Sequence, residues 1–218
     1  MRMHEQAVQT RQRLLEAAGE VFAERGFRNA TIREICDHAN ANVAAINYHF
    51  GDKKSLYAEV ISEYARLATQ KYPPTLGLGD NPTLEEQLYA FVRSFLHRIA
   101  DKGRPAWVGK LIACEMADPT AALDRLIDED FRPLNELLES IIRSILGARA
   151  TNDQVRLCAA SVIGQCLHYH FARPAIQRLH PELRFEPEDI EQLANHITRF
   201  SLAALRASAP PANGTEEP

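Results

Sequence analysis

The 218-residue sequence predicts an all-α protein in which a small N-terminal helical domain precedes a larger helical one. Apolar residues recur every three or four positions through most of the chain, as on the buried face of an amphipathic helix. No segment sustains the alternation of apolar and polar residues that is typical of a strand. Prolines and glycines between Pro73 and Pro82 interrupt the helical pattern and mark the boundary between the two domains.

The composition is that of an ordinary globular protein, with 45% apolar and 25% charged residues. The sequence lacks a 20-residue apolar run, so we expect no transmembrane helix. The N-terminal residues are too polar for a signal peptide, which predicts a cytoplasmic location. The four cysteines lack CxxC spacing and have apolar neighbours, so we expect buried free thiols rather than disulfides. They are Cys36, Cys114, Cys158 and Cys166.

The net charge of −4 argues against a protein that coats nucleic acid without selectivity. The charge is unevenly distributed, because residues 1–71 carry a net charge of +1 and the remainder carries −5. An acidic body with a slightly basic head would present the head alone to phosphates.

The N-terminal domain opens with a helix predicted over residues 8–25. Gly26 ends this helix and allows Phe27 to fold back onto it. Thr31 and Glu34 form a capping box that opens a second helix. The inward face of this second helix is predicted to hold Ile32, Ile35 and Cys36.

A tight turn follows, because Asn40 tolerates the left-handed conformation that the chain needs there. Asn42 caps a short helix over residues 43–50, Gly51 ends it, and Asp52 caps a longer helix over residues 53–71. We expect Leu56, Val60, Ile61 and Tyr64 to face inward. The larger domain shows helical periodicity in five segments with a short turn near 174–180, and the tail from Ala207 has no apolar pattern and is expected to be disordered. The five segments are 83–101, 105–117, 119–146, 152–171 and 187–206.

Two short helices joined by a tight turn are typical of a helix-turn-helix reader of duplex DNA. Its second helix is expected to enter the major groove, where small side chains such as Ala44 and Ala45 allow close approach and Asn42 and Asn47 offer donors and acceptors to bases. The remaining candidates fit the phosphate backbone, although Tyr48 could instead be a structural wedge and Lys53 or Lys54 a solvated lysine. The predicted DNA-binding residues are Thr31, Arg33, Asn42, Ala44, Ala45, Asn47, Tyr48, His49 and Lys53.

Two apolar stripes near the end of the chain predict a homodimer interface on helices 152–171 and 187–206, unless they pack inside the same chain. The first holds Val155, Cys158, Ala159, Val162, Cys166 and Tyr169, and the second holds Ile190, Leu193, Ala194, Ile197 and Phe200. Large apolar residues of the body are candidates for an effector pocket, with ordinary core packing as the alternative. They are Phe91, Phe95, Trp107, Met116, Phe131, Cys166 and His170. His168 and His170 lie two apart, which is the wrong spacing for a helical metal site, so no metal or cofactor is predicted.

Residues 8–64 resemble the DNA-binding domain of the TetR family of transcriptional regulators. The resemblance rests on the segments LLEAAGEVFAERGF, ATIREIC and AAINYHFGDKKSLY. The chain departs from the family pattern at the turn, where residues 39–42 read Ala-Asn-Ala-Asn instead of Ala-Gly-Val-Ser, and at Asn47, where the family usually has an aromatic residue. The segments GRPAWVGKLIACEMADPTAALDRLI, SVIGQCLHYHFARP and HITRFSLAAL resemble the C-terminal domain of the CerR/CecR-like branch. This resemblance implies a helical homodimer whose body binds an effector.

These observations predict an effector-responsive repressor that binds a pseudo-palindromic operator as a homodimer. The predicted domains are a DNA-binding domain over 1–52, a connecting helix over 53–72 that acts as a lever, and an effector and dimerisation domain over 80–206, followed by a tail over 207–218. We find no catalytic motif, so an enzyme is not expected. The alternatives are an activator or an unliganded architectural regulator of the same fold, and a small-molecule-binding or enzymatic helical protein with a vestigial head.

Overall fold

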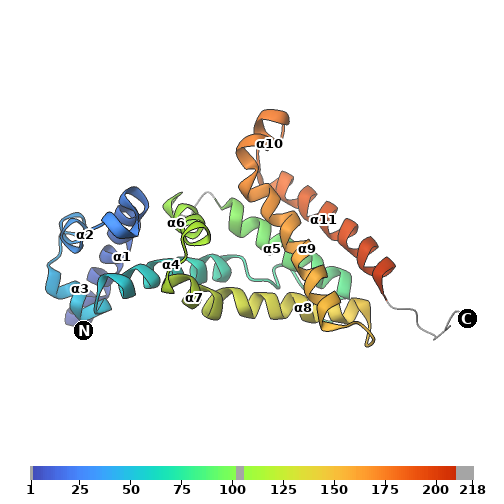
Figure 1. Cartoon of the computed structure of the whole chain (residues 1–218), viewed down its shortest axis with the longest axis horizontal. Helices are drawn as coiled ribbons and strands as arrows, with labels where there is room; N and C mark the ends of the chain where they lie inside the picture. Colours follow the sequence, from blue (N-terminus) through green and yellow to red (C-terminus); the bar gives the residue numbers. More distant parts are fainter. Residues whose placement is uncertain (1, 102–105, 210–218) are drawn as a thin grey trace, which may run out of the picture. The chain divides into compact units, whose positions relative to one another are not determined.

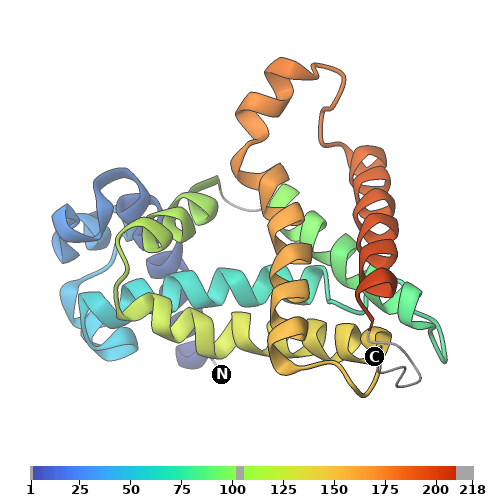
Figure 2. The same cartoon turned by 45° about the vertical axis from the view of Figure 1, so that its right-hand side comes forward.

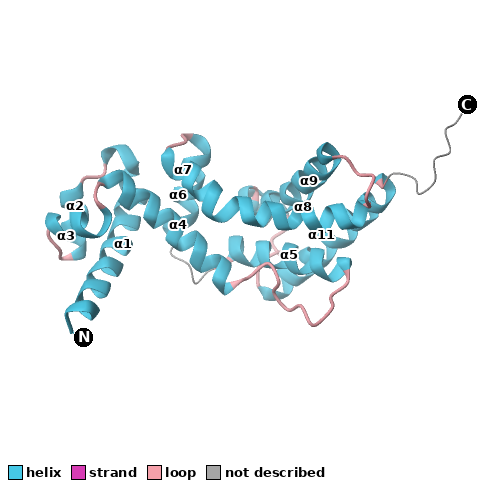
Figure 3. Cartoon of the chain, turned by 90° about the horizontal axis from the view of Figure 1, so that it is seen from below, coloured by secondary structure: helices cyan, strands magenta, loops and turns pink. Residues whose placement is uncertain are grey.

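The computed structural model describes residues 2–101 and 106–209, and every regular element within them is a helix (Figures 1 and 3). The predicted all-α fold class is therefore confirmed. The helices are α1 (Arg2–Asn29), α2 (Ile32–Ala39), α3 (Val43–Phe50), α4 (Lys53–Lys71), α5 (Leu84–Ala100), α6 (Ala106–Ala117), α7 (Ala121–Leu126), a π-helical segment (Ile127–Phe131), α8 (Arg132–Leu146), α9 (Asn152–Phe171), α10 (Arg173–Leu179) and α11 (Pro187–Ser208).

The helices form two compact units. The first unit contains residues up to Ala68 together with residues 102–132, so it holds α1, α2, α3, most of α4, α6 and α7. The second unit contains residues 69–101 and 133–218, with α5, α8, α9, α10 and α11. Residues 80–206, predicted as one effector and dimerisation domain, are shared between the two units. Helices α6 and α7 pack in one core with the N-terminal helices, not with α5 and α8.

The core of the first unit is built on the apolar face of α1, where Leu14, Leu15 and Phe22 are fully buried. Helix α1 is longer than the helix predicted over residues 8–25. It starts at Arg2, and after a kink at Gly26, where φ is +76°, it continues to Asn29. Gly26 interrupts the helix as expected because a residue without a Cβ adopts positive φ at little cost. Phe27 packs against the first unit's core as expected, with its ring 6.1 Å from that of Phe22.

The core of the second unit is formed mainly by α5, α8, α9 and α11 (Figure 2, green, yellow, orange and red). The predicted dimer stripe on α9 lies inside this core, because Val155, Ala159, Val162 and Cys166 are buried within the chain. Most of the stripe on α11 is buried in the same way. The interpretation of these stripes as a dimer surface was therefore wrong, and the alternative of packing within the chain is correct. Cys158 and Tyr169 are half-buried against the same core, and Phe200 is 61% exposed.

Most predicted helix boundaries agree with the structure because they depend on local capping chemistry. Thr31 and Glu34 form the expected capping box, and Thr83 and Glu86 form another. Asn40 adopts the left-handed conformation with φ of +46°. The segment predicted as one helix over 119–146 is instead divided by the π-helical segment into α7 and α8.

Three smaller expectations need correction or fall outside the structure. Cys114 is exposed and Cys158 is half-buried, whereas Cys36 and Cys166 are buried as predicted, and all four are free thiols. Helix α11 continues to Ser208, two residues past the predicted end. The helix start at Pro105 and the tail over 210–218 lie outside the described residues. Among those that are described, no helix has the length and apolar character needed to span a membrane.

Candidate nucleic-acid interface

The predicted recognition helix α3 has a capped start and a sharp end. Asn42 is its N-cap, and the side-chain Oδ1 of Asn42 accepts a hydrogen bond of 2.9 Å from the Ala45 N–H. Gly51, with φ of +83°, ends the helix after Phe50. Asn42 was predicted to offer both donor and acceptor to a base. The cap holds the Asn42 side chain against the start of α3 and takes up one of the two lone pairs of its oxygen.

One side of α3 anchors it and the other is open. Ile46 is fully buried in the core of the first unit and fixes the rotation of the helix. Opposite this anchor, Ala44 and Asn47 are exposed, and Tyr48 is 81% exposed. Tyr48 projects too far from the core to act as a wedge, which favours the predicted contact with DNA. An open face of small and polar side chains suits close approach to base edges.

Two of the predicted contacts are less open than expected. Ala45 is half-buried and packs against the core of the first unit, so it has less surface for a thymine methyl than Ala44. His49 is also half-buried, with its ring 4.8 Å from the ring of Tyr48 in an edge-to-face arrangement. Val43, which is 49% exposed, lies one helical turn before Asn47 and adds apolar surface to the same region.

The start of α2 holds Thr31 and Arg33, the two residues predicted to contact the adjacent DNA strand. The Thr31 hydroxyl donates a hydrogen bond of 2.8 Å to Glu34 Oε2 and accepts one of 3.2 Å from the Glu34 N–H. The bond from the Thr31 hydroxyl, together with one of 2.9 Å from the Thr31 backbone N–H, lowers the pKa of the Glu34 carboxyl because both stabilise its charged form. The Thr31 hydroxyl is therefore engaged in capping, whereas Arg33 is exposed.

The two lysines that follow α3 have different surroundings. Lys53 is half-buried, and its ammonium donates hydrogen bonds to the carbonyl oxygens of Ala30 at 2.6 Å and Arg28 at 3.3 Å. Lys54 is exposed. Asp52 caps α4 by accepting a hydrogen bond of 2.7 Å from the Ser55 N–H, and this bond lowers the pKa of the Asp52 carboxyl.

A buried carboxylate on α6, which was not predicted from the sequence, lies in the first unit. Glu115 is 1% exposed and accepts a hydrogen bond of 2.9 Å from the Thr120 N–H at the start of α7. A hydrogen bond to Glu115 and burial together raise the pKa of Tyr57 on α4, with burial the larger cause. The sequence does mark Glu115, because it is a charged residue on the same helical face as the apolar Val108 and Leu111.

A charged group on the surface of the first unit joins three of its helices. Glu59 on α4 pairs with Arg11 on α1 and, at 2.8 Å, with Arg125 on α7. Arg125 also contacts Glu129 at 2.8 Å, and these acidic partners raise its pKa. Pairs of this kind are only partly screened when half-buried, so they help to hold α7 against the head.

The predicted effector-pocket residues fall into both units. Trp107 and Phe131 pack against the core of the first unit, where Met116 is exposed. Phe91, Phe95, Cys166 and His170 belong to the second unit, and Phe91 and Cys166 are closed inside its core. Burial of the thiol raises the pKa of Cys166 to about 12. His170 borders a small cavity of about 10 Å³ together with Arg173 and Phe185. Within the described residues, no group of His, Cys, Asp and Glu could hold a metal.

The comparison with known families covers both parts of the chain. Residues 14–60 match the bacterial regulatory proteins of the tetR family. Residues 84–205, more than half of the chain, match the C-terminal domain of the HTH-type transcriptional dual regulator CecR. The chain belongs to the TetR family, in the branch with a CecR-type C-terminal domain.

Individual relatives agree with this assignment. CecR from Shigella flexneri is 27% identical over 87% of this chain and 88% of its own length. The HTH-type transcriptional repressor NicS from Pseudomonas putida is 33% identical, over 43% of this chain and 45% of NicS. Among solved structures, a TetR-family transcriptional regulator from Streptomyces coelicolor has a TM-score of 0.64 at 16% identity, covering 91% of this chain and 97% of its own. FadR from Bacillus subtilis, solved with stearoyl-CoA, has a TM-score of 0.65 at 15% identity, covering 88% and 97%.

The TetR assignment gives the helix-turn-helix its context. The chain is a transcriptional regulator, and TetR-family regulators are not enzymes. This removes the enzymatic protein with a vestigial head from the alternatives. The family match over residues 14–60 contains all of α2 and α3. The helices that are predicted to contact DNA therefore lie in the part of the chain that matches the family.

Proposed function

We propose that this TetR-family protein is a cytoplasmic, effector-responsive repressor that binds a pseudo-palindromic operator through α3. The observation that carries the proposal is the open outer face of α3, where Asn47 and Tyr48 stand clear of the core while Ile46 anchors the helix. A rigid helix with small and polar outer residues fits the major groove.

The predicted contacts divide by chemistry. Asn42, Ala44 and Asn47 are proposed to meet base edges, with Ala45 contributing less because it is half-buried. The backbone contacts are proposed to come from the periphery of the helix-turn-helix. They are Thr31, Arg33, Tyr48 and His49, whereas the ammonium of Lys53, which was also predicted from the sequence, is bonded to the carbonyl oxygens of Ala30 and Arg28.

The operator proposal is tested by selection from a random-sequence duplex library with the purified protein. We expect enrichment of a pseudo-palindrome whose half-sites lie about 34–36 Å apart or somewhat more, followed by specific binding in a gel-shift assay with competitor DNA. If no sequence is enriched over the starting library, the operator proposal fails.

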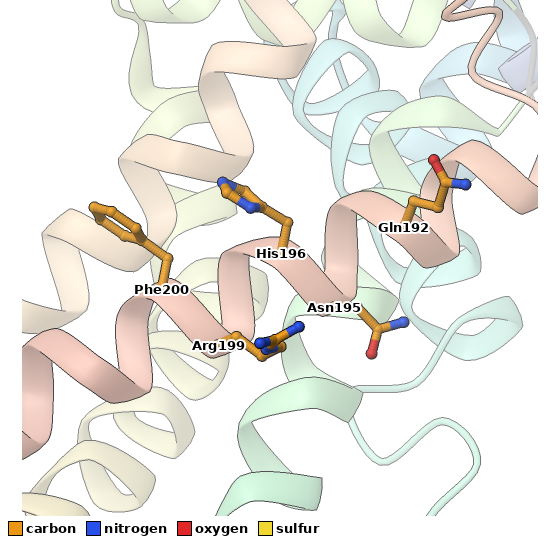
Figure 4. Close-up of a pocket in the computed structure, with 5 residues that line it drawn as sticks. All are labelled: Gln192, Asn195, His196, Arg199 and Phe200. Carbon is orange, nitrogen blue, oxygen red and sulfur yellow. The ribbon is translucent and has the colours of Figure 1, made fainter.

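We propose that the homodimer forms through α9 and α11, but through different faces from those that the sequence suggested. The outer face of α9 carries Leu157, 70% exposed, and Gly164, on which a Cβ would meet no atom within 4 Å. On α11, His196 and Phe200 project from the same side of the helix (Figure 4). They border an open hollow of about 570 Å³. Exposed apolar residues around small ones are typical of an association surface.

The two helices meet where Gln165 Nε2 donates a hydrogen bond of 3.1 Å to Ser201 Oγ. Gly164 and Phe200 are the chain neighbours of these two residues, so both lie next to the line of contact between α9 and α11. A partner subunit could therefore cover both helices at once and bury Phe200.

We propose that a small-molecule effector controls DNA binding. An effector acts by binding one conformation better than another, so release of DNA requires two states with different operator affinity. Helix α4, which starts directly after the DNA-reading helices and continues into the second unit, is the proposed lever. Since FadR was solved with stearoyl-CoA, acyl-CoA thioesters are the first compounds to titrate against the protein–operator complex. A fall in the fluorescence anisotropy of a labelled operator on titration shows release of the protein and supports the proposal. An unchanged anisotropy with acyl and aromatic compounds alike argues against it.

An activator is the second candidate, because the relative CecR is described as a dual regulator. Reporter expression from the selected operator separates the two functions. Deletion of a repressor raises the output, whereas deletion of an activator lowers it.

A further inference from the structure

Lys53 is the first residue of α4, yet its side chain reaches back to the end of α1. Its ammonium lies 2.6 Å from the Ala30 carbonyl oxygen and 3.3 Å from that of Arg28. The same ammonium lies 4.9 Å from the centre of the Phe27 ring. Two carbonyls and one aromatic face therefore surround a single charge.

This environment suits an ammonium group. Carbonyls at the end of a helix have no partner within the helix, and a lysine can satisfy them. Hydrogen bonds from a charged donor are stronger than neutral ones. The ring of Phe27 adds a cation–π attraction, and it is held in place by the rings of Phe22 and Tyr57.

Lys53 and Ala30 lie at the two ends of the segment that contains α2 and α3. Ala30 directly precedes Thr31, the N-cap of α2, and Lys53 comes two residues after Gly51, which ends α3. The contact between Lys53 and Ala30 thus closes a loop that contains all of α2 and α3. A closed loop has fewer conformations, so the contact fixes where α3 stands.

We propose that Lys53 is a positioning residue that clamps the helix-turn-helix closed, and that its neighbour Lys54 supplies the charge that meets a phosphate. The proposal deepens the proposed function and rests on it. An ammonium has three N–H donors, and two of those of Lys53 already serve carbonyls. Lys54 is exposed in the first turn of the 19-residue helix α4, so its ammonium is free of the carbonyl contacts that hold Lys53 and can reach a phosphate.

Salt dependence separates the two roles, because each phosphate contact that is lost lowers the slope of log K against log salt concentration by about 1. The variants are Lys53→Met, Lys53→Arg and the matched control Lys54→Met. The DNA probes are the duplex recovered with the wild-type protein and an unrelated duplex of equal length. Affinity is measured by fluorescence anisotropy between 50 and 200 mM salt, with the Tm of each variant.

For Lys53→Met we expect about a tenfold loss of affinity for the selected duplex, a smaller loss for the unrelated one, and an unchanged salt slope. We also expect its Tm to fall by about 3–8 °C. Lys53→Arg should restore much of both, since a guanidinium can donate to the same two carbonyls. Lys54→Met should lower the slope by about 1 for both duplexes and leave Tm unchanged.

The proposal is overturned if Lys53→Met lowers the slope by about 1 and leaves Tm unchanged, because Lys53 would then be an ordinary phosphate contact. Hydrogen exchange of residues 31–50 without DNA provides a second test. Exchange must be faster in Lys53→Met than in the wild type, and equal exchange contradicts the clamp. If the wild type shows no sequence preference at all, the proposed function fails, while the exchange and Tm results still decide the clamp.

Discussion

At the scale of the residue, Asn47 and Tyr48 are neighbours on α3 with different capacities. The amide of Asn47 carries a donor and an acceptor side by side, which matches the edge of an adenine in the major groove. The phenol of Tyr48 offers a single hydroxyl at the end of the helix, which suits a phosphate. Both residues are exposed, so neither role requires a rearrangement of the core.

Asn47→Ala is therefore expected to relax the base preference at one position per half-site, at about 1–3 kcal/mol of discrimination. Selection of sequences with the variant and the wild type in parallel measures the change. Tyr48→Phe is the comparison, since it should weaken binding to all sequences alike. A uniform loss from Asn47→Ala would show that Asn47 contacts the backbone.

The thiols offer a second prediction at this scale. Cys166 is buried, and its raised pKa of about 12 keeps the thiol protonated at pH 8. Because the pKa is raised, the reactive thiolate appears in quantity only as the pH approaches that value. Cys114 is exposed. A thiol-reactive dye at pH 8 should label Cys114 rapidly, and Cys166 only after unfolding, as peptide mass spectrometry would show. Rapid labelling of Cys166 in the native protein would contradict its burial.

At the scale of the element, α6 packs against α1 at Gly19, where the missing side chain leaves a notch for Trp107. A Cβ on Gly19 would lie 2.2 Å from ring atoms of Trp107, so the absence of a side chain at Gly19 makes room for the indole. Trp107 also packs edge-to-face with Tyr64 at 4.6 Å. The contact of α6 with the head therefore depends on a glycine within a helix, a residue that lowers the intrinsic stability of α1.

Gly19→Ala is expected to displace Trp107 and to destabilise the protein by about 1–3 kcal/mol, even though alanine favours the helix more than glycine does. Trp107 is the single tryptophan, so a red shift of the intrinsic fluorescence reports its displacement directly. The control is Gly79→Ala, where a Cβ meets nothing within 4 Å. An unshifted spectrum in Gly19→Ala would mean that the notch does not fix the indole.

At the scale of the whole molecule, the proposed dimer depends on the outer faces of α9 and α11. Leu157 and Phe200 are large apolar residues that the described chain leaves exposed. A TetR-family regulator that reads two half-sites needs both heads held by one interface. Dimerisation and operator binding should therefore be lost together.

Leu157→Glu is expected to convert the dimer to a monomer and to weaken operator binding, because a carboxylate buried in the interface costs several kcal/mol without a partner. Analytical ultracentrifugation measures the first effect and anisotropy the second. Leu179→Glu on α10 is the matched control, since Leu179 is similarly exposed at 74%. A dimer that persists in Leu157→Glu would place the interface elsewhere.

Much of the fold was predictable because its determinants are local. The caps at Thr31, Asn42 and Asp52 act over three residues, so they can be recognised in the sequence. The π-helical segment and the extension of α1 past Gly26 were not predicted. The π-helical segment starts without a side-chain cap, and α1 resumes after the kink at Gly26, so the signals that mark helix ends in a sequence reveal neither.

The sequence by itself determined the helical class, the DNA-reading segment and the family, since periodicity, caps and motif order are properties of consecutive residues. The tertiary structure decided which stripes are core, that α6 and α7 share a core with the head, and that the ammonium of Lys53 is bound to Ala30 and Arg28. Each of these depends on contacts between residues distant in sequence. A periodic pattern shows that a helix has an apolar face, but what covers that face is settled by the rest of the chain.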